Sequence, residues 1–414
     1  MAADGAVPVS TRSRAVPSPA VERVRALLAR VDAVEPQVQA WVVLDRAALL
    51  RQAEAADAAP PAGPLHGVPV GLKDIIDTAD LPTQNGTVLH AGRQPSVDAL
   101  LVQRLKHAGA LVMGKTVTTE LATYAPGPTR NPHHPAHTPG GSSSGSAAAV
   151  AAGMVPLAVG TQTNGSVLRP ASFCGVVGFK PSAGRIPRDG VLEQSPSFDC
   201  VGVFANSVEE AALLAAVLAD EAVPDLAPLS PALAWFDGIA WDRVAPDAQA
   251  ACRAWQHAQG LPAVALPTGC DTAIEQHRVV MEAEIGQAFA ALDRTQLSAS
   301  LQGQIERGLR TASADLQQGR DAALALRAAF SLWFDEHGLD ALAMPAALGT
   351  APAGLASTGD PVMCTLASFA GLPAISLPLL SGANGLPLGV QLIGRFGDDR
   401  RLLRAAAALL SQAR

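Results

Sequence analysis

Short apolar segments that are typical of buried strands alternate with helical segments along most of this 414-residue chain. VPVGL (68–72), ALVMGKTV (110–117), VPLAVG (155–160) and GVQLIG (389–394) are examples. Strands that alternate with helices favour an α/β fold, because parallel neighbours need a crossover between them. We therefore predict one domain over residues 19–414, after a flexible arm at residues 1–18. Its large mixed, mostly parallel central sheet is expected to carry helices on both sides.

Helical periodicity marks the segments between these strands. From Ala20 to about Asp57 apolar residues recur at helical spacing, and Pro36 is expected to separate this helix from a second one at Leu49–Ala58. Pro170 suits the first turn of another helix. Further helices are predicted at 98–107, 207–220 and 398–413, and through most of 245–335.

The composition limits the classes of function. A net charge of −7 gives no basic stripe for nucleic acid. The N-terminus has no apolar core of a signal peptide, and the 14-residue small-apolar run Ala147–Gly160 is too short to span a bilayer. Five widely spaced cysteines without C-x-x-C predict neither a disulfide framework nor a zinc site. We expect a cytoplasmic protein that binds neither membranes nor nucleic acid.

The stretch TPGGSSSGSAAAVAAG (138–153) is a glycine- and serine-rich loop that leads into a helix-forming segment. Glycine loops that open helices often hold phosphate. However, a P-loop carries Lys after its last glycine, and a dinucleotide fingerprint follows a strand; neither holds here. From composition alone, a flexible linker with an N-cap serine is an alternative. These residues by themselves leave the role of the serines open.

Lys73 is one of only four lysines in the chain, and it ends an apolar strand pattern in HGVPVGLKDIID (66–77). The glycines and prolines of this segment share one face with Lys73, so another segment can approach that face closely. From these residues alone, a buried lysine paired with Asp74 or Asp77 is favoured over a catalytic one.

Ser166 ends a second polar segment, GTQTNGS (160–166). Neither G-x-S-x-G nor S-x-x-K surrounds it, which argues against α/β-hydrolase and β-lactamase-type sites. Elsewhere, HHPAH (133–137) lacks the spacing of a helical metal site, so no metal is expected. Glu282 and Glu284 are predicted on a solvated helix face, and the cysteines as small core residues.

Several of these segments together resemble the amidase signature family over about residues 20–414, and the short, malonamidase-like members most. The resemblance implies the α/β fold of that family and an enzyme that hydrolyses linear amides. It is carried by HGVPVGLKDIIDTADLPTQNGT (66–87), TPGGSSSGSAAAVAAG (138–153), GTQTNGSVLRPASFCGVVGFKPS (160–182), TGDPV (358–362) and LPLGVQLIG (386–394).

The resemblance also implies a Ser–cisSer–Lys triad. By motif position Ser166 is the nucleophile, Ser142 is the bridging serine after a cis peptide bond, and Lys73 is the base. A serine hydroxyl is a weak nucleophile until a base accepts its proton, and a lysine normally titrates near 10.4, so Lys73 must be desolvated. The implied oxyanion hole consists of the backbone of Thr163, Asn164, Gly165 and Ser166, and the implied substrate-binding residues are Arg169 and Ser143, the latter in support near Lys73.

Two positions depart from the common family pattern. Gln162 stands where many members have Asp in G-T-D, and the arginine lies three residues after Ser166 instead of two. Malonamidase-like members share this shift, and their arginine is implicated in gripping the substrate carboxylate. Because guanidinium groups form charge-assisted bonds to carboxylates, we expect Arg169 to select amides that carry a free carboxylate. A structural arginine at a helix start is the alternative.

The main hypothesis is therefore an amidohydrolase that forms a serine acyl-enzyme, without cofactor or metal. Its expected partner is a small amide substrate, malonamate-like, and its expected assembly is a homodimer. Two alternatives stay open. One is the A subunit of a glutamyl-tRNA amidotransferase, which shares the triad but hands ammonia to a partner. The other is a non-catalytic carboxylate-binding relative.

Overall fold

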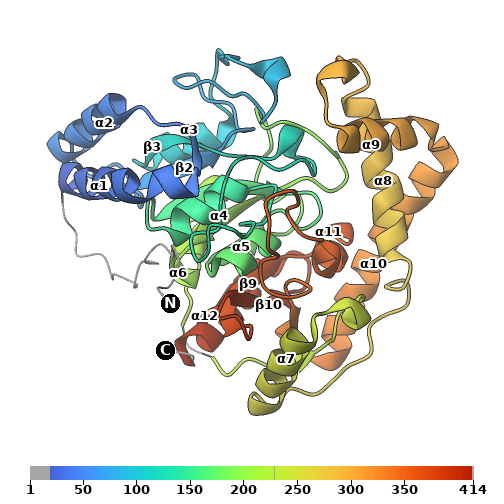
Figure 1. Cartoon of the computed structure of the whole chain (residues 1–414). Coiled ribbons are helices and arrows are strands. Elements are labelled where there is room, and N and C mark those ends of the chain that lie inside the picture. Colours follow the sequence, from blue (N-terminus) through green and yellow to red (C-terminus); the bar gives the residue numbers. More distant parts are fainter. Residues whose placement is uncertain (1–18, 228, 413–414) are drawn as a thin grey trace, which may run out of the picture.

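A ten-stranded sheet runs through the computed structural model, which describes residues 19–227 and 229–412 (Figure 1). The predicted single α/β domain with a mixed sheet is confirmed, whereas the predicted arm at residues 1–18 lies outside the described residues. The strands, in the order β1-β3-β2-β4-β6-β5-β9-β10-β8-β7 across the sheet, are β1 (Trp41–Val43), β2 (Pro69–Lys73), β3 (Leu111–Thr116), β4 (Leu157–Gln162), β5 (Val177–Lys180), β6 (Cys200–Ala205), β7 (Leu233–Trp235), β8 (Ala341–Pro345), β9 (Ala374–Ser381) and β10 (Pro387–Ile393).

The expectation of mostly parallel pairing is wrong. β2 is parallel to β3 and β4, and β7 is parallel to β8. The other six neighbouring pairs of the described sheet are antiparallel. The connections explain this result: β9 and β10 form a hairpin, and β5 reaches β6 through a loop without a helix, so no parallel crossover occurs there. Neither β1 nor the strands β5 to β7 were predicted from the sequence.

Helices cover both faces of the sheet, as predicted. Along β3, Leu111 and Met113 belong to a core shared with α1, α2, α4 and α5, whereas Val112 belongs to the core shared with α3, α6 and α12. The helices are α1 (Ala20–Val38), α2 (Arg46–Ala58), α3 (Leu100–His107), α4 (Ser144–Ala151), α5 (Leu168–Cys174), α6 (Val208–Ala219), α7 (Pro246–Ala258), α8 (Ala273–Ala288), α9 (Ala299–Arg310), α10 (Ser313–His337), α11 (Thr365–Phe369) and α12 (Asp399–Gln412), with short 3₁₀ turns at Val88–His90, Glu120–Ala122, Trp241–Arg243, Arg294–Gln296 and Val362–Cys364.

Of two local predictions near the N-terminus, the one for Pro36 is wrong and the one for Gly71 is confirmed. Pro36 does not end α1, which continues to Val38 before Gln39 adopts a left-handed conformation (φ 55°). The face of β2 that carries Gly71 is approached closely, as expected, because a Cβ at Gly71 would lie 3.2 Å from the indole of Trp41. Among the described residues, no helix combines the length and the apolarity that a membrane crossing needs.

The serine- and glycine-rich stretch 138–153 is a buried structural element and not a flexible linker. All residues of α4 are buried. A Cβ at Gly145 would lie 2.3 Å from the carbonyl oxygen of Ala40 and 2.4 Å from the backbone nitrogen of Val117, so only glycine allows this approach. Small residues therefore let α4 pack tightly against its neighbours, and this packing places Ser142 and Ser143 beside the carboxyl ends of β2 and β4.

Candidate active site

Lys73 is the last residue of β2, and its side chain is fully buried. Its Nζ is hydrogen-bonded to the hydroxyl of Ser142 at 2.7 Å and to the hydroxyl of Thr161 at 2.8 Å. Burial lowers the pKa of Lys73 from 10.5 to about 7, although the negative charge of Asp199 acts in the opposite direction. A lysine in this environment is partly neutral at physiological pH and can accept a proton.

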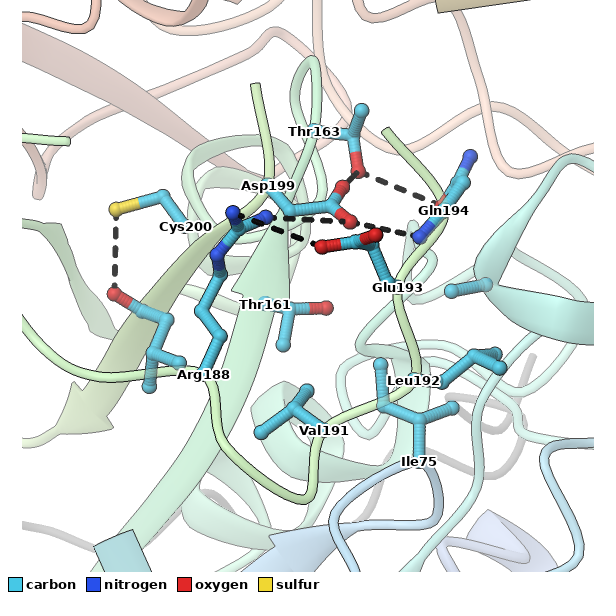
Figure 2. A pocket seen from close by; sticks show the side chains of 12 residues that line it. Ile75, Thr161, Thr163, Arg188, Val191, Leu192, Glu193, Gln194, Asp199 and Cys200 are labelled. Atoms are coloured by element: carbon cyan, nitrogen blue, oxygen red, sulfur yellow. Dashed lines mark hydrogen bonds and ion pairs between the residues drawn. The ribbon is translucent and has the colours of Figure 1, made fainter. Parts of the chain in front are cut away.

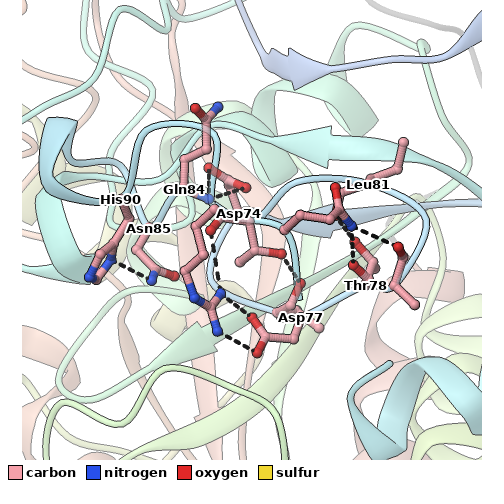
Figure 3. Close-up of polar contacts among 12 residues, drawn as sticks. Asp74, Asp77, Thr78, Leu81, Gln84, Asn85 and His90 are labelled. Atoms are coloured by element: carbon pink, nitrogen blue, oxygen red, sulfur yellow. Dashed lines mark hydrogen bonds and ion pairs between the residues drawn. The ribbon is translucent and has the colours of Figure 1, made fainter. Parts of the chain in front are cut away.

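The aspartates that follow Lys73 have other partners, so the alternative of a simple lysine–aspartate pair does not hold. Asp77 forms a two-pronged ion pair with Arg93, at 2.6 and 2.8 Å (Figure 3). Asp74 accepts hydrogen bonds from the backbone N–H of Gln84 and lies 3.8 Å from Nζ of Lys115, the second buried lysine of the region. These contacts hold the loop after β2 and leave the amine of Lys73 to the two hydroxyl groups.

Ser142 and Ser143 connect the loop before α4 to this lysine. The peptide bond between Gly141 and Ser142 is cis, as the resemblance implied. The hydroxyl of Ser143 donates to the carbonyl of Thr161 at 3.1 Å and accepts from its N–H at 3.2 Å. Ser143 is fully buried, so it positions Thr161, and through it Lys73, and presents no surface to a substrate.

Ser166 lies between β4 and α5, and it is partly exposed. The backbone N–H of Ser143 donates to its carbonyl at 3.4 Å, which places it beside the serine-rich loop. Within the described part of the chain, no hydrogen bond joins the hydroxyl groups of Ser142 and Ser166. Such contacts are often long before a substrate binds. The structure thus brings Lys73 and Ser142 into direct contact and places Ser166 in backbone contact with the neighbouring Ser143.

The backbone of the 163–166 loop is oriented by hydrogen bonds to its carbonyl groups. A trans peptide group holds its C=O and N–H in opposite directions, so a carbonyl bound on one side turns the following N–H to the other side. The donors are the Nε2 of His277 for the Thr163 carbonyl (3.0 Å), the hydroxyl of Ser368 for the Asn164 carbonyl and the backbone N–H of Arg169 for the Gly165 carbonyl (3.0 Å).

The N–H groups of Asn164, Gly165 and Ser166 belong to these three peptide groups. Across residues 19–227 and 229–412, none of the three donates a hydrogen bond to another group of the chain. All three residues line the same pocket. Free, oriented backbone donors beside a serine hydroxyl are the arrangement that stabilises a tetrahedral oxyanion.

Gln162 explains one departure from the family pattern. Its side-chain oxygen accepts the N–H groups of Val167 and Leu168 at 2.9 and 3.0 Å, at the start of α5. Its side-chain nitrogen donates to the hydroxyl of Ser368 at 2.9 Å. An aspartate could accept hydrogen bonds but could not donate one, so the amide ties both ends of the loop to neighbouring elements.

Arg169 lines the same pocket as Ser166. Its Nη2 donates to the carbonyl of Gly141 at 2.7 Å and to the hydroxyl of Thr358 at 3.1 Å. Its Nε and Nη1 are buried and have no hydrogen-bond partner among the described residues. The pocket continues into a wider cleft, with Tyr124 and Met281 lining both. The site therefore offers a buried guanidinium without an ion-pair partner among the described residues, in the pocket that Ser166 also lines.

Four residues around the loop had no assigned role in the sequence-based hypothesis: Thr161, Gln194, Asp199 and His277. Asp199 accepts a hydrogen bond from the Thr163 hydroxyl at 2.6 Å and from the backbone N–H of Gln194 at 2.7 Å (Figure 2). Burial raises the pKa of the Asp199 carboxyl, and these hydrogen bonds oppose the shift. No sequence pattern identifies these residues, because most come from segments that meet the loop only in the folded chain.

The structure also tests the predictions for two glutamates and for the cysteines. Glu282 and Glu284 are buried, not solvated: Glu282 pairs with Arg307 at 2.6 Å, and Glu284 pairs with Arg320 at 2.6 Å, which joins α8 to α9 and α10. The five cysteines are buried, as expected of core residues. Within the described ranges, no group of His, Cys, Asp and Glu residues is arranged to hold a metal ion.

Comparison with known proteins supports the resemblance in sequence. The chain is 34% identical over 452 aligned residues to the A subunit of the glutamyl-tRNA(Gln) amidotransferase of Nitratidesulfovibrio vulgaris (strain DP4), with 92% of this chain and 91% of that protein covered. The corresponding protein of Roseiflexus castenholzii is also 34% identical, with 94% and 91% covered. These relatives are similar to the chain over nearly their whole length.

Solved structures and a family model agree with this similarity. A structure described as an amidase has a TM-score of 0.87 at 28% identity, with 95% of this chain and 96% of that chain covered. Native peptide amidase from Stenotrophomonas maltophilia has a TM-score of 0.80 at 28% identity, with 96% and 94% covered. The family model described as Amidase matches residues 22–236 and 266–403. The chain therefore belongs to the amidase family.

Proposed function

We propose that this chain hydrolyses a small linear amide that also carries a carboxylate, a malonamate-like molecule. The observation that carries the proposal is the buried guanidinium of Arg169, whose Nε and Nη1 lack partners among the described residues and which lines one pocket with Ser166. A buried charge without a partner costs free energy, and a substrate carboxylate would offset that cost. The same molecule would then present its amide carbonyl to Ser166.

In the proposed reaction, neutral Lys73 accepts the hydroxyl proton of Ser142, and Ser142 accepts that of Ser166. The Oγ of Ser166 forms a bond to the amide carbon, and the carbonyl becomes an oxyanion at the free N–H groups of the 163–166 loop. The C–N bond breaks, and the amine leaves with the proton returned through Ser142. Water then cleaves the acyl-enzyme by the same relay, releases the acid and restores neutral Lys73.

The positions of Arg169 and Ser166 support a short acyl group. Arg169 follows Ser166 by three residues, and both line the same pocket. A substrate that reaches both groups at once needs its carboxylate within a few bonds of the amide carbonyl. Malonamate satisfies this condition, whereas a simple aliphatic amide leaves the guanidinium unpaired.

Replacing Arg169 with Gln is expected to lower kcat/KM for malonamate roughly 30- to several-thousand-fold, because the substrate carboxylate loses a buried charge partner. This factor corresponds to a loss of about 2–5 kcal/mol in binding free energy. Propionamide, which has no carboxylate, should lose far less. The measurement is ammonia release from both substrates by wild type and variant. Arg278→Gln is the matched control, since Arg278 lines the outer cleft but is paired with Glu275 and Glu282. Equal losses for both substrates would refute carboxylate selection.

The second candidate is the A subunit of a glutamyl-tRNA(Gln) amidotransferase, and the sequence comparisons favour it more than they favour a malonamate hydrolase. Glutamine also carries a carboxylate, so Arg169 is compatible with it. The alignment to the relative from N. vulgaris is longer than this chain, which means that the relative has segments the chain lacks. Glutamine cleavage that depends on added partner proteins, tRNA and ATP would select this candidate over the free-standing hydrolase.

A further inference from the structure

We infer that His277 is a positioning residue of the oxyanion hole, because its side chain binds the Thr163 carbonyl and thereby turns the Asn164 N–H toward the pocket. This inference rests on the proposed function of the 163–166 loop. Thr163 and His277 are 114 residues apart in sequence, and the Nε2 of His277 lies 3.0 Å from the Thr163 carbonyl oxygen. A carbonyl only accepts hydrogen bonds, so Nε2 must carry the hydrogen.

The ring of His277 has little freedom to leave this position. It is buried on α8, with 1% of its surface exposed. It stacks on Phe198 with ring centroids 4.5 Å apart and meets Phe369 edge-on at 6.4 Å. Burial also lowers the pKa of His277 to about 4, so the ring is neutral at physiological pH and has a single N–H. The contact with Thr163 assigns that N–H to Nε2.

Thr163 is held from a second side as well. Its hydroxyl donates to Asp199 at 2.6 Å (Figure 2). Asp199 itself accepts hydrogen bonds from the backbone N–H groups of Gln194 and Ser195 at 2.7 and 2.9 Å. With the side chain anchored, the remaining local freedom is rotation of the peptide group between Thr163 and Asn164. That rotation would break the His277 bond and point a carbonyl oxygen into the pocket.

A rotated peptide group would affect the transition state more than the bound substrate. The oxyanion exists only after Ser166 has attacked, so a donor for it contributes to kcat and little to ground-state binding. Carboxylate binding by Arg169 does not involve this peptide group. Replacing His277 should therefore lower kcat and leave the affinity for the product-like inhibitor malonate unchanged. A general structural role of His277 would not separate these two quantities.

The test compares His277→Phe with His277→Gln. Phenylalanine keeps a ring against Phe198 but removes the donor, whereas glutamine offers an amide N–H of similar reach. We expect His277→Phe to lower kcat for the amide that wild type cleaves best by roughly 10- to 100-fold, somewhat less than removal of a whole oxyanion donor. The affinity of a boronic acid analogue, which forms a tetrahedral adduct, should fall in parallel. Malonate inhibition should stay within about twofold, and His277→Gln should recover most of the loss.

His257→Phe, at an exposed histidine of α7, is the matched control and should behave as wild type. An unchanged kcat in His277→Phe would overturn the inference. So would equal losses of boronate and malonate affinity, or a glutamine variant as impaired as the phenylalanine variant. Failure of the proposed substrate class is visible separately, because it appears in wild type and Arg169→Gln and does not depend on His277.

Discussion

Replacing Lys73 with Met is expected to lower kcat for amide cleavage by roughly 10⁴- to 10⁶-fold, the loss typical of removing one member of a nucleophile–base unit. The amine of Lys73 contacts Ser142 at 2.7 Å, and methionine cannot accept a proton there. Single-turnover kinetics with malonamate, or with the best amide from a substrate screen, measures the loss. A Lys73→Met protein that cleaves amides at the wild-type rate would end the proposed mechanism.

The pH dependence of the wild-type enzyme should report the same group. Only neutral Lys73 can accept a proton, and its pKa in the folded protein is about 7. Below that value kcat/KM should rise about tenfold per pH unit, and it should level off above it. A profile measured from pH 5 to 9 checks this expectation. A flat profile across that range would mean that another group acts as the base.

The Lys73→Met substitution is also expected to stabilise the folded protein at neutral pH. The pKa of Lys73 is 10.5 when unfolded and about 7 when folded, so between these values the unfolded chain binds the additional proton. The contribution of Lys73 to the free energy of unfolding therefore rises with pH across this window and is least favourable at and below pH 7. Lys73→Met should gain up to roughly 5 kcal/mol at pH 7.

Urea unfolding of wild type and Lys73→Met at pH 7 and pH 10 measures this difference. The gain should shrink at pH 10, because this pH is close to the pKa of Lys73 in the unfolded chain. Removing the proton, which burial requires, then costs less free energy. Lys180→Met is the comparison variant. Lys180 is also buried, burial lowers its pKa as well, and it lies outside the proposed site. A stability difference that does not change with pH would contradict the desolvated state of Lys73.

Ser166→Ala is the second substitution with a large expected effect. It removes the atom that would form the acyl-enzyme, so kcat should fall roughly 10⁴- to 10⁶-fold and a fluorophosphonate probe should no longer label the protein. Intact-protein mass spectrometry detects the label directly. Ser357→Ala is the control, because Ser357 is an exposed serine that lines the outer cleft and should leave labelling unchanged.

The labelling experiment also decides between an enzyme and a non-catalytic relative. If wild type takes up no probe and cleaves no amide, the carboxylate-binding alternative replaces the hydrolase. If Ser166→Ala is still labelled at full stoichiometry, another serine is the nucleophile. Wild-type labelling that disappears only in Ser166→Ala is the expected result.

The residues of the proposed site lie within short, continuous segments, but family resemblance and not local pattern assigned their roles. From the residues alone, the serines had no assigned role and Lys73 was expected to pair with an aspartate. Lys73 ends an apolar strand pattern, and Ser142 and Ser166 lie in motif-bearing loops next to secondary structure. Lys73 and Ser142 are 69 residues apart in sequence and in hydrogen-bonding contact in the structure, as the triad hypothesis requires. The cis peptide bond before Ser142 was implied by family resemblance and not by any residue pattern.

Other features depend on contacts between distant segments, which no local pattern encodes. The directions of β5, β6 and β9 depend on which strands become neighbours in the folded sheet, and β6 pairs antiparallel with β4 and β5, as β5 does with β9. The sheet is therefore largely antiparallel, although strands and helices alternate along the chain. Glu282 and Glu284 read as solvated on an isolated helix, but arginines on α9 and α10 cover them. The contacts of Thr161 and His277 likewise depend on the folded arrangement.

The amino-acid sequence by itself determined the α/β class, and its motifs implied the segments of the proposed triad and the arginine three residues after Ser166. Tertiary structure alone decided that burial lowers the pKa of Lys73, that two nitrogen atoms of Arg169 have no partner among the described residues, and that His277 contacts the Thr163 carbonyl. The physical reason is that desolvation and hydrogen-bond geometry depend on everything packed around a group, and most of those neighbours are remote in the chain.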